Sequence, residues 1–266
     1  MIKHPCYTGG QGHNIARIHL PIAKKCNLGC AFCELRDNAQ PETLSTEEAI
    51  AALEYHKEHL ENLKIVGIAG PGEPLVNSST FQMLEYVQRN HPDLSTCLCT
   101  NGVEVLNKLA DIERVCDYFT VTVNALSVEV AKELYCYVKV DGSVSREDNA
   151  YSKYLDLVWS GIEELGKLKS LKGFKINTIL VPGVNDHEIE SIAKKAAKLG
   201  VMELNIKSFM PRGLLKDQKA PTRLQMQHAI ARAEKWIPVF KHCKNCRPDA
   251  CGVPGRDLYL LTGQCG

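Results

Sequence analysis

Short apolar runs alternate with amphipathic stretches along most of this chain, and no other feature of the sequence constrains the fold as strongly. Runs with the length and composition of buried parallel strands lie at 16–22, 64–69, 96–100, 118–124, 174–181 and 202–208. Helices are predicted between them at about 45–60, 80–89, 105–112, 127–137, 150–169 and 188–199. Repeated strand–helix units imply parallel strands with right-handed crossovers. About six units are too few for a closed eight-unit barrel, so we predict an α/β fold, a partial (β/α)6 barrel.

Three segments are expected. Residues 1–14 are rich in Gly, Pro and His and form an irregular arm that can carry ligands, although a frayed terminus is the commoner outcome. Residues 15–211 form the α/β core. Residues 212–266 contain a helix at about 222–236 and then a Cys-rich tail.

Three thiols, Cys26, Cys30 and Cys33, follow the first predicted strand within one short loop. An iron–sulfur cube takes four ligands, usually thiolates. Three protein ligands leave one iron open to a small molecule, so we expect these cysteines to be both metal ligands and the catalytic centre. A structural zinc site or buried free thiols are the alternatives. Zinc normally takes four protein ligands in a closed site, and buried cysteines need not keep this spacing.

A second group of thiols lies in the tail, where Cys243, Cys246 and Cys251 come close together. A lone Cys-x2-Cys is ambiguous between zinc, redox and iron–sulfur roles, but no βαβ unit follows it, so we favour a metal site. Cys6, His13, His19 and Cys97 are scattered soft or borderline ligands that could together hold a further cluster. Most of the remaining thiols are expected to be bystanders, because buried cysteine is a common small apolar residue: Cys99, Cys116, Cys136 and Cys265.

Composition excludes several classes of function. The formal net charge is +1 and no basic block is present, so a nucleic-acid partner is not expected. The first residues lack the regions of a signal peptide and no apolar run would span a bilayer, so we expect a cytoplasmic protein without membrane contact. Twelve cysteines in a reducing compartment favour metal ligands over disulfides, and oxygen sensitivity follows.

The pattern Cys26-x3-Cys30-x2-Cys33 after an apolar segment resembles the radical S-adenosylmethionine (SAM) superfamily. The resemblance implies that SAM binds the open iron of the cluster through its amino and carboxylate groups. It also implies that the segment containing Gly70, Gly72 and Glu73 approaches the methionine moiety, which glycine permits because it has no side chain. An aromatic residue at Phe32 would lie near the adenine. Three residues at or beside strand ends could complete the pocket or could equally serve packing or capping: Thr122, Asn124 and Ile179.

A closer resemblance, from residue 4 to about 257, is to the NifB family of nitrogenase-cofactor maturases, in a short form without the additional carrier-like domain. It is carried by His4-Pro5-Cys6-Tyr7, the segments 16–21, 66–75, 97–102, 121–125 and 181–186, and Cys243-x2-Cys246-Arg247-Pro248-Asp249-Ala250. The resemblance implies that two [4Fe-4S] clusters are fused around a SAM-derived carbide to give an eight-iron cofactor precursor. One SAM supplies the methyl group, and cleavage of another gives the radical that attacks it.

The resemblance also implies ligand sets. Cys26, Cys30 and Cys33 would hold the radical-generating cluster, Cys243 and Cys246 one substrate cluster, and Cys6, Cys97 and either His13 or His19 the other. Expected partners are SAM, an iron–sulfur cluster donor protein, an electron donor protein and a cofactor carrier or scaffold protein.

One departure from the family pattern leaves alternatives open. The family usually has a cysteine five residues after the third loop thiol, where this chain has Asn38, a poor ligand for iron in a sulfide cluster. Cys251 is a candidate replacement. A second hypothesis is a radical SAM enzyme with one auxiliary cluster that acts on a peptide or small molecule. A third is an iron–sulfur carrier or electron-transfer protein, which would need neither the glycine-rich segment nor a barrel.

Overall fold

The computed structural model describes residues 4–7, 14–33 and 42–260 of the chain. Its centre is an eight-stranded sheet in the order β11-β10-β1-β3-β4-β5-β8-β9, and the strands from β1 to β9 in this order all pair in parallel. These parallel strands are β1 (Ala16–His19), β3 (Leu63–Ile68), β4 (Ser95–Thr100), β5 (Tyr118–Thr122), β8 (Gly173–Leu180) and β9 (Glu203–Ser208). They are the strands that the sequence predicts, and they form a partial barrel.

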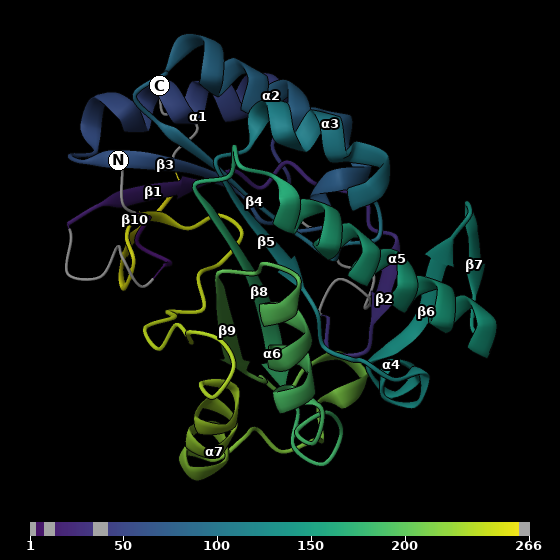
Figure 1. Cartoon of the computed structure of the whole chain (residues 1–266). Helices are drawn as coiled ribbons and strands as arrows, with labels where there is room; N and C mark the ends of the chain where they lie inside the picture. The colour runs from purple at the N-terminus through teal and green to yellow at the C-terminus, as the bar shows by residue number, and fades with distance from the viewer. Residues whose placement is uncertain (1–3, 8–13, 34–41, 261–266) are drawn as a thin grey trace.

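Helices cover the convex side of this sheet, while the C-terminal segment (yellow) runs near β1 and β9 (Figure 1). Alternation of side chains explains the two environments. Leu98, Phe119 and Ile176 belong to the apolar core, whereas Cys97 and Lys175 on the same strands line an interior cavity. The helices are α1 (Thr46–His59), α2 (Ser78–Asn90), α3 (Val105–Val115), α4 (Val128–Leu134), α5 (Asp148–Lys167), α6 (Ile189–Lys198) and α7 (Arg223–Ala233), with single 3-10 turns at η3 (Pro74–Val76) and η4 (Gly213–Leu215).

Local signals fix the start of α1. The Ser45 side chain accepts a hydrogen bond from the Glu48 backbone N–H, and the Glu48 carboxylate accepts one from the Ser45 N–H. This capping box satisfies two backbone donors that the first turn of a helix leaves free. The helix predicted from about residue 45 therefore begins with this cap.

A small second sheet departs from the predicted pattern. It contains β2 (Leu28–Cys30), β6 (Tyr135–Val140) and β7 (Ser143–Ser145), all antiparallel. The predicted helix at 127–137 is wrong beyond Leu134, where α4 ends and β6 begins. The reason is tertiary: Tyr135 and Val138 are buried on β6, and this strand pairs with the cysteine loop.

The tail joins the main sheet. β10 (Cys251–Val253) pairs antiparallel with β1, and β11 (Arg256–Leu258) pairs with β10. The N-terminal edge of the parallel sheet is thereby covered by residues from the other end of the chain. Among the described residues, no helix has both the length and the apolar character needed to cross a membrane.

Candidate metal and cofactor site

The loop that carries Cys26, Cys30 and Cys33 is held in place by the small sheet. The Ala31 N–H donates to the Leu134 carbonyl (2.8 Å), and the Cys33 N–H donates to the Cys30 carbonyl (3.2 Å). Partial burial, together with the neighbouring thiols Cys26 and Cys33, raises the pKa of Cys30 well above its usual value. The thiol is therefore protonated until a metal displaces the proton.

The glycine-rich segment lies directly against the chain that enters this loop. The Gly72 N–H donates to the Ala23 carbonyl (2.6 Å), and the Glu73 N–H donates to the Lys25 carbonyl (2.8 Å). A Cβ at Gly72 would overlap the Lys25 carbonyl oxygen and lie 2.8 Å from that of Ala23. Gly70 has a φ of +141°, which disfavours any residue with a side chain. Glycine is thus required for this close approach.

The Glu73 carboxylate is buried, with 3% of the residue exposed, and is engaged by the protein itself. Oε1 accepts hydrogen bonds from the Thr100 hydroxyl (2.6 Å) and the Leu75 N–H (3.0 Å), and Oε2 accepts one from the Asn101 N–H (2.6 Å). Burial raises the pKa of Glu73 to about 7. Glu73 therefore ties the glycine-rich segment to the end of β4.

Asn124 is likewise committed to protein contacts. Its Oδ1 accepts from the Ile179 N–H (2.8 Å), and its Nδ2 donates to the Tyr135 hydroxyl (3.2 Å). The Thr122 hydroxyl lies 3.9 Å from the Cys99 sulfur. Of the strand-end residues named from the sequence, Asn124 has the geometry of a structural residue that links β5, β6 and β8.

Two cavities share part of their lining, and one of them borders the cysteine loop at Phe32. The first, which we call the thiol cavity, has a volume of about 160 Å³ and is partly open to solvent. Its lining includes Cys6, Cys97, Cys99, Cys243, Cys246, His4, His19, Lys175, Asn177 and Asn205. The second contains Phe32 and Ile179, and Lys207, Cys246 and Pro248 line both. Thiols from the arm, from β4 and from the tail, which are remote in sequence, thus share one cavity beside the residues that the sequence links to the cofactor.

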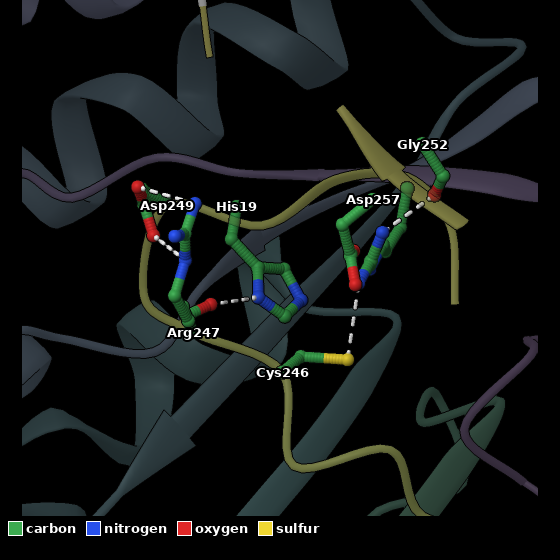
Figure 2. Close-up of polar contacts among 7 residues, drawn as sticks. His19, Cys246, Arg247, Asp249, Gly252 and Asp257 are labelled. Atoms are coloured by element: carbon green, nitrogen blue, oxygen red, sulfur yellow. Dashed lines mark hydrogen bonds and ion pairs between the residues drawn. The ribbon is translucent and has the colours of Figure 1, made fainter. Parts of the chain in front are cut away.

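His19 is oriented toward the thiol cavity by a backbone contact. Its Nδ1 lies 3.2 Å from the Arg247 carbonyl oxygen and donates to it, because that oxygen can only accept (Figure 2). The lone pair of the neutral ring is then on Nε2, as in histidines that bind metals. Across β3, Gly67 pairs with both His19 and Cys97, and a Cβ there would lie 2.7 Å from the His19 ring. The glycine keeps the space between these two side chains open.

His4 has the opposite arrangement. The Cys6 backbone N–H donates to His4 Nδ1 (3.0 Å), so the proton of the neutral ring is on Nε2. His4 is 2% exposed, and its Nε2 has no hydrogen-bond partner within the described part of the chain. Of these two histidines, His19 has the free lone pair and His4 does not; His242 also lines the cavity.

A fully buried arginine holds the tail thiol. Arg17 donates to the Cys246 sulfur (3.1 Å) and to the Gly252 carbonyl (2.7 Å), and it forms an ion pair with Asp257 of β11. These three partners of the guanidinium, Cys246, Gly252 and Asp257, are labelled in Figure 2. A hydrogen bond from the Cys6 thiol and the charge of Arg17 lower the pKa of Cys246 to about 6. Cys246 is therefore a thiolate at neutral pH, in contact with a thiol of the arm.

The structure separates Cys251 from the other tail thiols. Cys251 pairs with Ile18 in the sheet and shares its helix-covered face, opposite to His19 and the thiol cavity. Its sulfur lies 3.4 Å from His56 Nδ1 of α1, and the residue is fully buried. The candidate role of Cys251 as a replacement ligand is therefore not supported by its position. His13, Asn38 and Cys265 lie outside the described residues.

No group of three or more His, Cys, Asp or Glu side chains in the described ranges converges closely enough to hold a single metal ion. A cluster of several irons binds each protein ligand at a different iron, so its ligands must lie apart from one another.

Sequence reasoning missed Arg17, Lys175 and Cys99. A usable signal was available for Cys99, because residues two apart on a strand share a face and Cys97 was already a candidate.

Comparisons with known proteins agree with this geometry. The model of the Radical SAM superfamily matches residues 20–196. The chain is 31% and 32% identical to the FeMo cofactor biosynthesis proteins NifB of Chlorobaculum tepidum and Klebsiella pneumoniae, over 95% and 96% of its own length but only 62% and 57% of theirs. It is 32% identical to NifB of Methanocaldococcus jannaschii, over 94% of this chain and 86% of that relative.

Solved structures show the same fold. Streptococcus suis SuiB bound to S-adenosylmethionine has a TM-score of 0.66 at 12% identity, over 88% of this chain and 51% of SuiB. Methylornithine synthase has a TM-score of 0.51 at 14% identity, over 88% of this chain and 66% of the synthase. Membership of the superfamily implies a [4Fe-4S] cluster and SAM. The chain belongs to the radical SAM superfamily and, within it, to the NifB family.

Proposed function

We propose that this protein fuses two [4Fe-4S] clusters, with insertion of a SAM-derived carbide, to form the eight-iron precursor of the nitrogenase cofactor. The observation that carries the proposal is the thiol cavity, where cysteines of the arm, of β4 and of the tail meet a histidine of β1. A maturase needs such a chamber for iron–sulfur substrates beside its radical-generating site. The names of the NifB relatives support the assignment to cofactor biosynthesis.

The residues of the loop fit a resident cluster. Cys26, Cys30 and Cys33 offer thiols and no competing carboxylate or imidazole between them, and Gly72 leaves the backbone beside them free of a side chain. These cysteines would hold the cluster. When bound, it supplies the electron that breaks a carbon–sulfur bond of SAM. The chain's own task is to position SAM along the glycine-rich segment and to exclude water from the adjoining cavities.

The contacts support a different grouping of the substrate ligands from the one implied by the family resemblance. Cys6 hydrogen-bonds to Cys246, so we assign Cys6 with Cys243 and Cys246 to one substrate cluster. His19 and Cys97 flank Gly67 and belong to the other. His19 is preferred as the histidine ligand because its Nε2 lone pair is free.

Buried cations complement these thiolates. Lys175 is 5% exposed, donates to the Cys6 carbonyl (2.6 Å) and lines the thiol cavity. With Arg17 it places positive charge beside ligands that become anionic when they bind iron. In this scheme an iron–sulfur donor protein delivers the substrate clusters, an electron donor protein reduces the resident cluster, and a carrier or scaffold protein accepts the product.

The test is anaerobic reconstitution with iron and sulfide. Wild-type protein should bind about three cubes per chain, and Cys26→Ala and Cys243→Ala should each remove about one. The reconstituted protein should also cleave SAM under strong reductant. A wild-type content of one cube would contradict the proposal.

A second candidate is a radical SAM enzyme that carries one auxiliary cluster and acts on a peptide or small molecule. It is favoured by the single cavity that Cys6, Cys97, Cys243 and Cys246 share, since four thiols can close one cube. This candidate predicts about two cubes per chain. It also predicts that Cys97→Ala and Cys243→Ala affect the same cluster.

A further inference from the structure

Cys99 lies in the wall of the thiol cavity, and the function proposed above leaves it unassigned. It follows Cys97 by two residues on β4, so both side chains are on the inward face of the strand. Their Cα atoms are about 6.6 Å apart at the usual rise of a strand. That separation is compatible with ligands of two different irons in one cluster.

The neighbouring strands extend this pair toward a histidine. Gly67 on β3 pairs with His19 on one side and with Cys97 on the other. A Cβ at Gly67 would lie 3.2 Å from His19 Nε2 and 3.8 Å from the Cys97 Cβ, so both side chains border the space that the glycine leaves. His19, Cys97 and Cys99 thus line one continuous part of the cavity.

Polar partners hold the Cys99 sulfur. Asn177 Nδ2 donates to it (3.8 Å), and the Thr122 hydroxyl lies 3.9 Å away. Asn205 Nδ2 donates to Asn177 Oδ1 (2.9 Å), which fixes the Asn177 amide with its NH₂ group toward the sulfur. Donors aimed at a thiolate are typical of the environment that orients a metal ligand.

The amide network also ends in an open acceptor. Asn205 is 3% exposed and lines the thiol cavity, and its Oδ1 has no hydrogen-bond partner in the described part of the chain. A buried polar atom without a partner is costly in a finished core. It is expected beside a chamber that a larger ligand fills.

Cys116 shows what a bystander thiol looks like in the same fold. It is 4% exposed and belongs to the apolar core with Ile112 and Val115. It does not line the thiol cavity. Cys99 differs in each of these respects, and the apolar packing that accounts for Cys116 does not account for the Asn177 donor and the Thr122 hydroxyl at Cys99.

We propose that Cys99 is a protein ligand of the substrate cluster held by His19 and Cys97, so that this cluster has three protein ligands. The inference rests on the proposed function, because it requires an iron–sulfur substrate in the thiol cavity. It assigns to this chain a cluster-binding thiolate on β4 in addition to Cys97.

The test uses full-length protein in which the loop ligands are removed by Cys26→Ala, Cys30→Ala and Cys33→Ala, so that the remaining iron reports only the cavity. Anaerobic reconstitution with iron and sulfide is followed by iron analysis and by electron paramagnetic resonance after reduction. Adding Cys99→Ala should remove most of the about four irons that Cys97→Ala removes. Adding Cys116→Ala, the matched control, should remove none. Cys99→Ser keeps the shape and should shift the resonance of this cluster, because oxygen replaces a sulfur ligand.

Differential alkylation avoids mutation of Cys99. Iodoacetamide should label Cys99 in protein without iron and not in reconstituted protein, whereas labelling of Cys116 should not depend on iron. If Cys97→Ala removes iron while Cys99→Ala and Cys99 labelling show no effect, the inference is overturned and the proposed function stands. If neither Cys97→Ala nor Cys243→Ala changes the iron content, the proposed function itself fails.

Discussion

Replacement of Arg17 by methionine should release the C-terminal segment from the sheet. Arg17 is fully buried, and its hydrogen bonds join β1 to Gly252 of β10 and to Cys246. Methionine keeps most of the apolar stem but has none of the donors. The core can stay folded while the tail opens, so the effect should appear as local opening more than as global unfolding.

The size of the effect follows from the partners. Each hydrogen bond from a charged donor contributes about 1.5 kcal/mol, so two of them contribute about 3 kcal/mol. The ion pair with Asp257 adds little, because that side chain is 38% exposed and solvent screens the charges. A loss of about 3 kcal/mol raises the population of the open tail roughly 150-fold, since each 1.4 kcal/mol is a factor of ten.

Cys251 provides the readout, because it is fully buried on β10 and pairs with Ile18, on the face of the sheet opposite to Arg17. Iodoacetamide labelling of anaerobic protein without iron, followed by mass spectrometry, measures how often its thiol is exposed. The rate should rise roughly 150-fold in Arg17→Met if opening is fast compared with labelling. The matched control is Arg256→Met on β11, whose guanidinium donates to exposed Asn14 (2.6 Å). An unchanged rate in Arg17→Met, or an equal rise in Arg256→Met, would refute the anchoring role.

Three further predictions concern the tail and the glycine-rich segment. The Cys6 thiol hydrogen-bonds to Cys246 and lowers the pKa of Cys246 to about 6. The rate at which iodoacetamide labels Cys246 in iron-free protein should therefore be half-maximal near pH 6. A labelling rate that still rises above pH 8 would contradict this. Burial raises the pKa of Glu73 from 4.5 to about 7. The contribution of Glu73 to the free energy of unfolding is therefore full below pH 4.5 and falls by roughly 3 kcal/mol as the pH rises through 7. Urea titrations at pH 5 and 8 should show this fall in wild type and not in Glu73→Gln. Gly72→Ala should destabilise the protein by about 2 kcal/mol or more, because its Cβ would clash with backbone carbonyls, and it should weaken SAM binding measured by calorimetry. The control is Gly183→Ala, whose Cβ meets no atom within 4 Å. That variant should cost about 1 kcal/mol through its positive φ alone and should leave SAM binding intact.

The parallel strands could be predicted from the sequence because each has its own apolar run, whose length and composition are typical of a buried strand. The three-residue strands β2, β7, β10 and β11 could not be predicted. They are too short for a period of two to be read, and they exist because of the partners with which they pair. The same holds for residues 135–137, where pairing with the cysteine loop prevails over helical spacing.

The site residues that could be predicted are likewise those with a local sequence pattern, and the others depend on contacts between distant parts of the chain. The loop cysteines and the glycine-rich segment are contiguous in sequence, so their spacing alone points to their chemistry. The contact between Cys6 and Cys246 depends on how two ends of the chain dock, and no local pattern encodes it. Cys251 shows the converse, since it is near Cys246 in sequence but on the other face of the sheet.

The pairing of β10 with β1 has a consequence for how the protein matures in the cell. β1 precedes the other described strands in the chain, but its outer neighbour β10 follows all six parallel strands. The cysteine loop can meet its partner strand β6 once residue 140 has left the ribosome. Cys6 cannot meet Cys246 until synthesis has passed residue 246. During translation the cysteine loop can thus reach its folded surroundings well before the wall of the thiol cavity is completed.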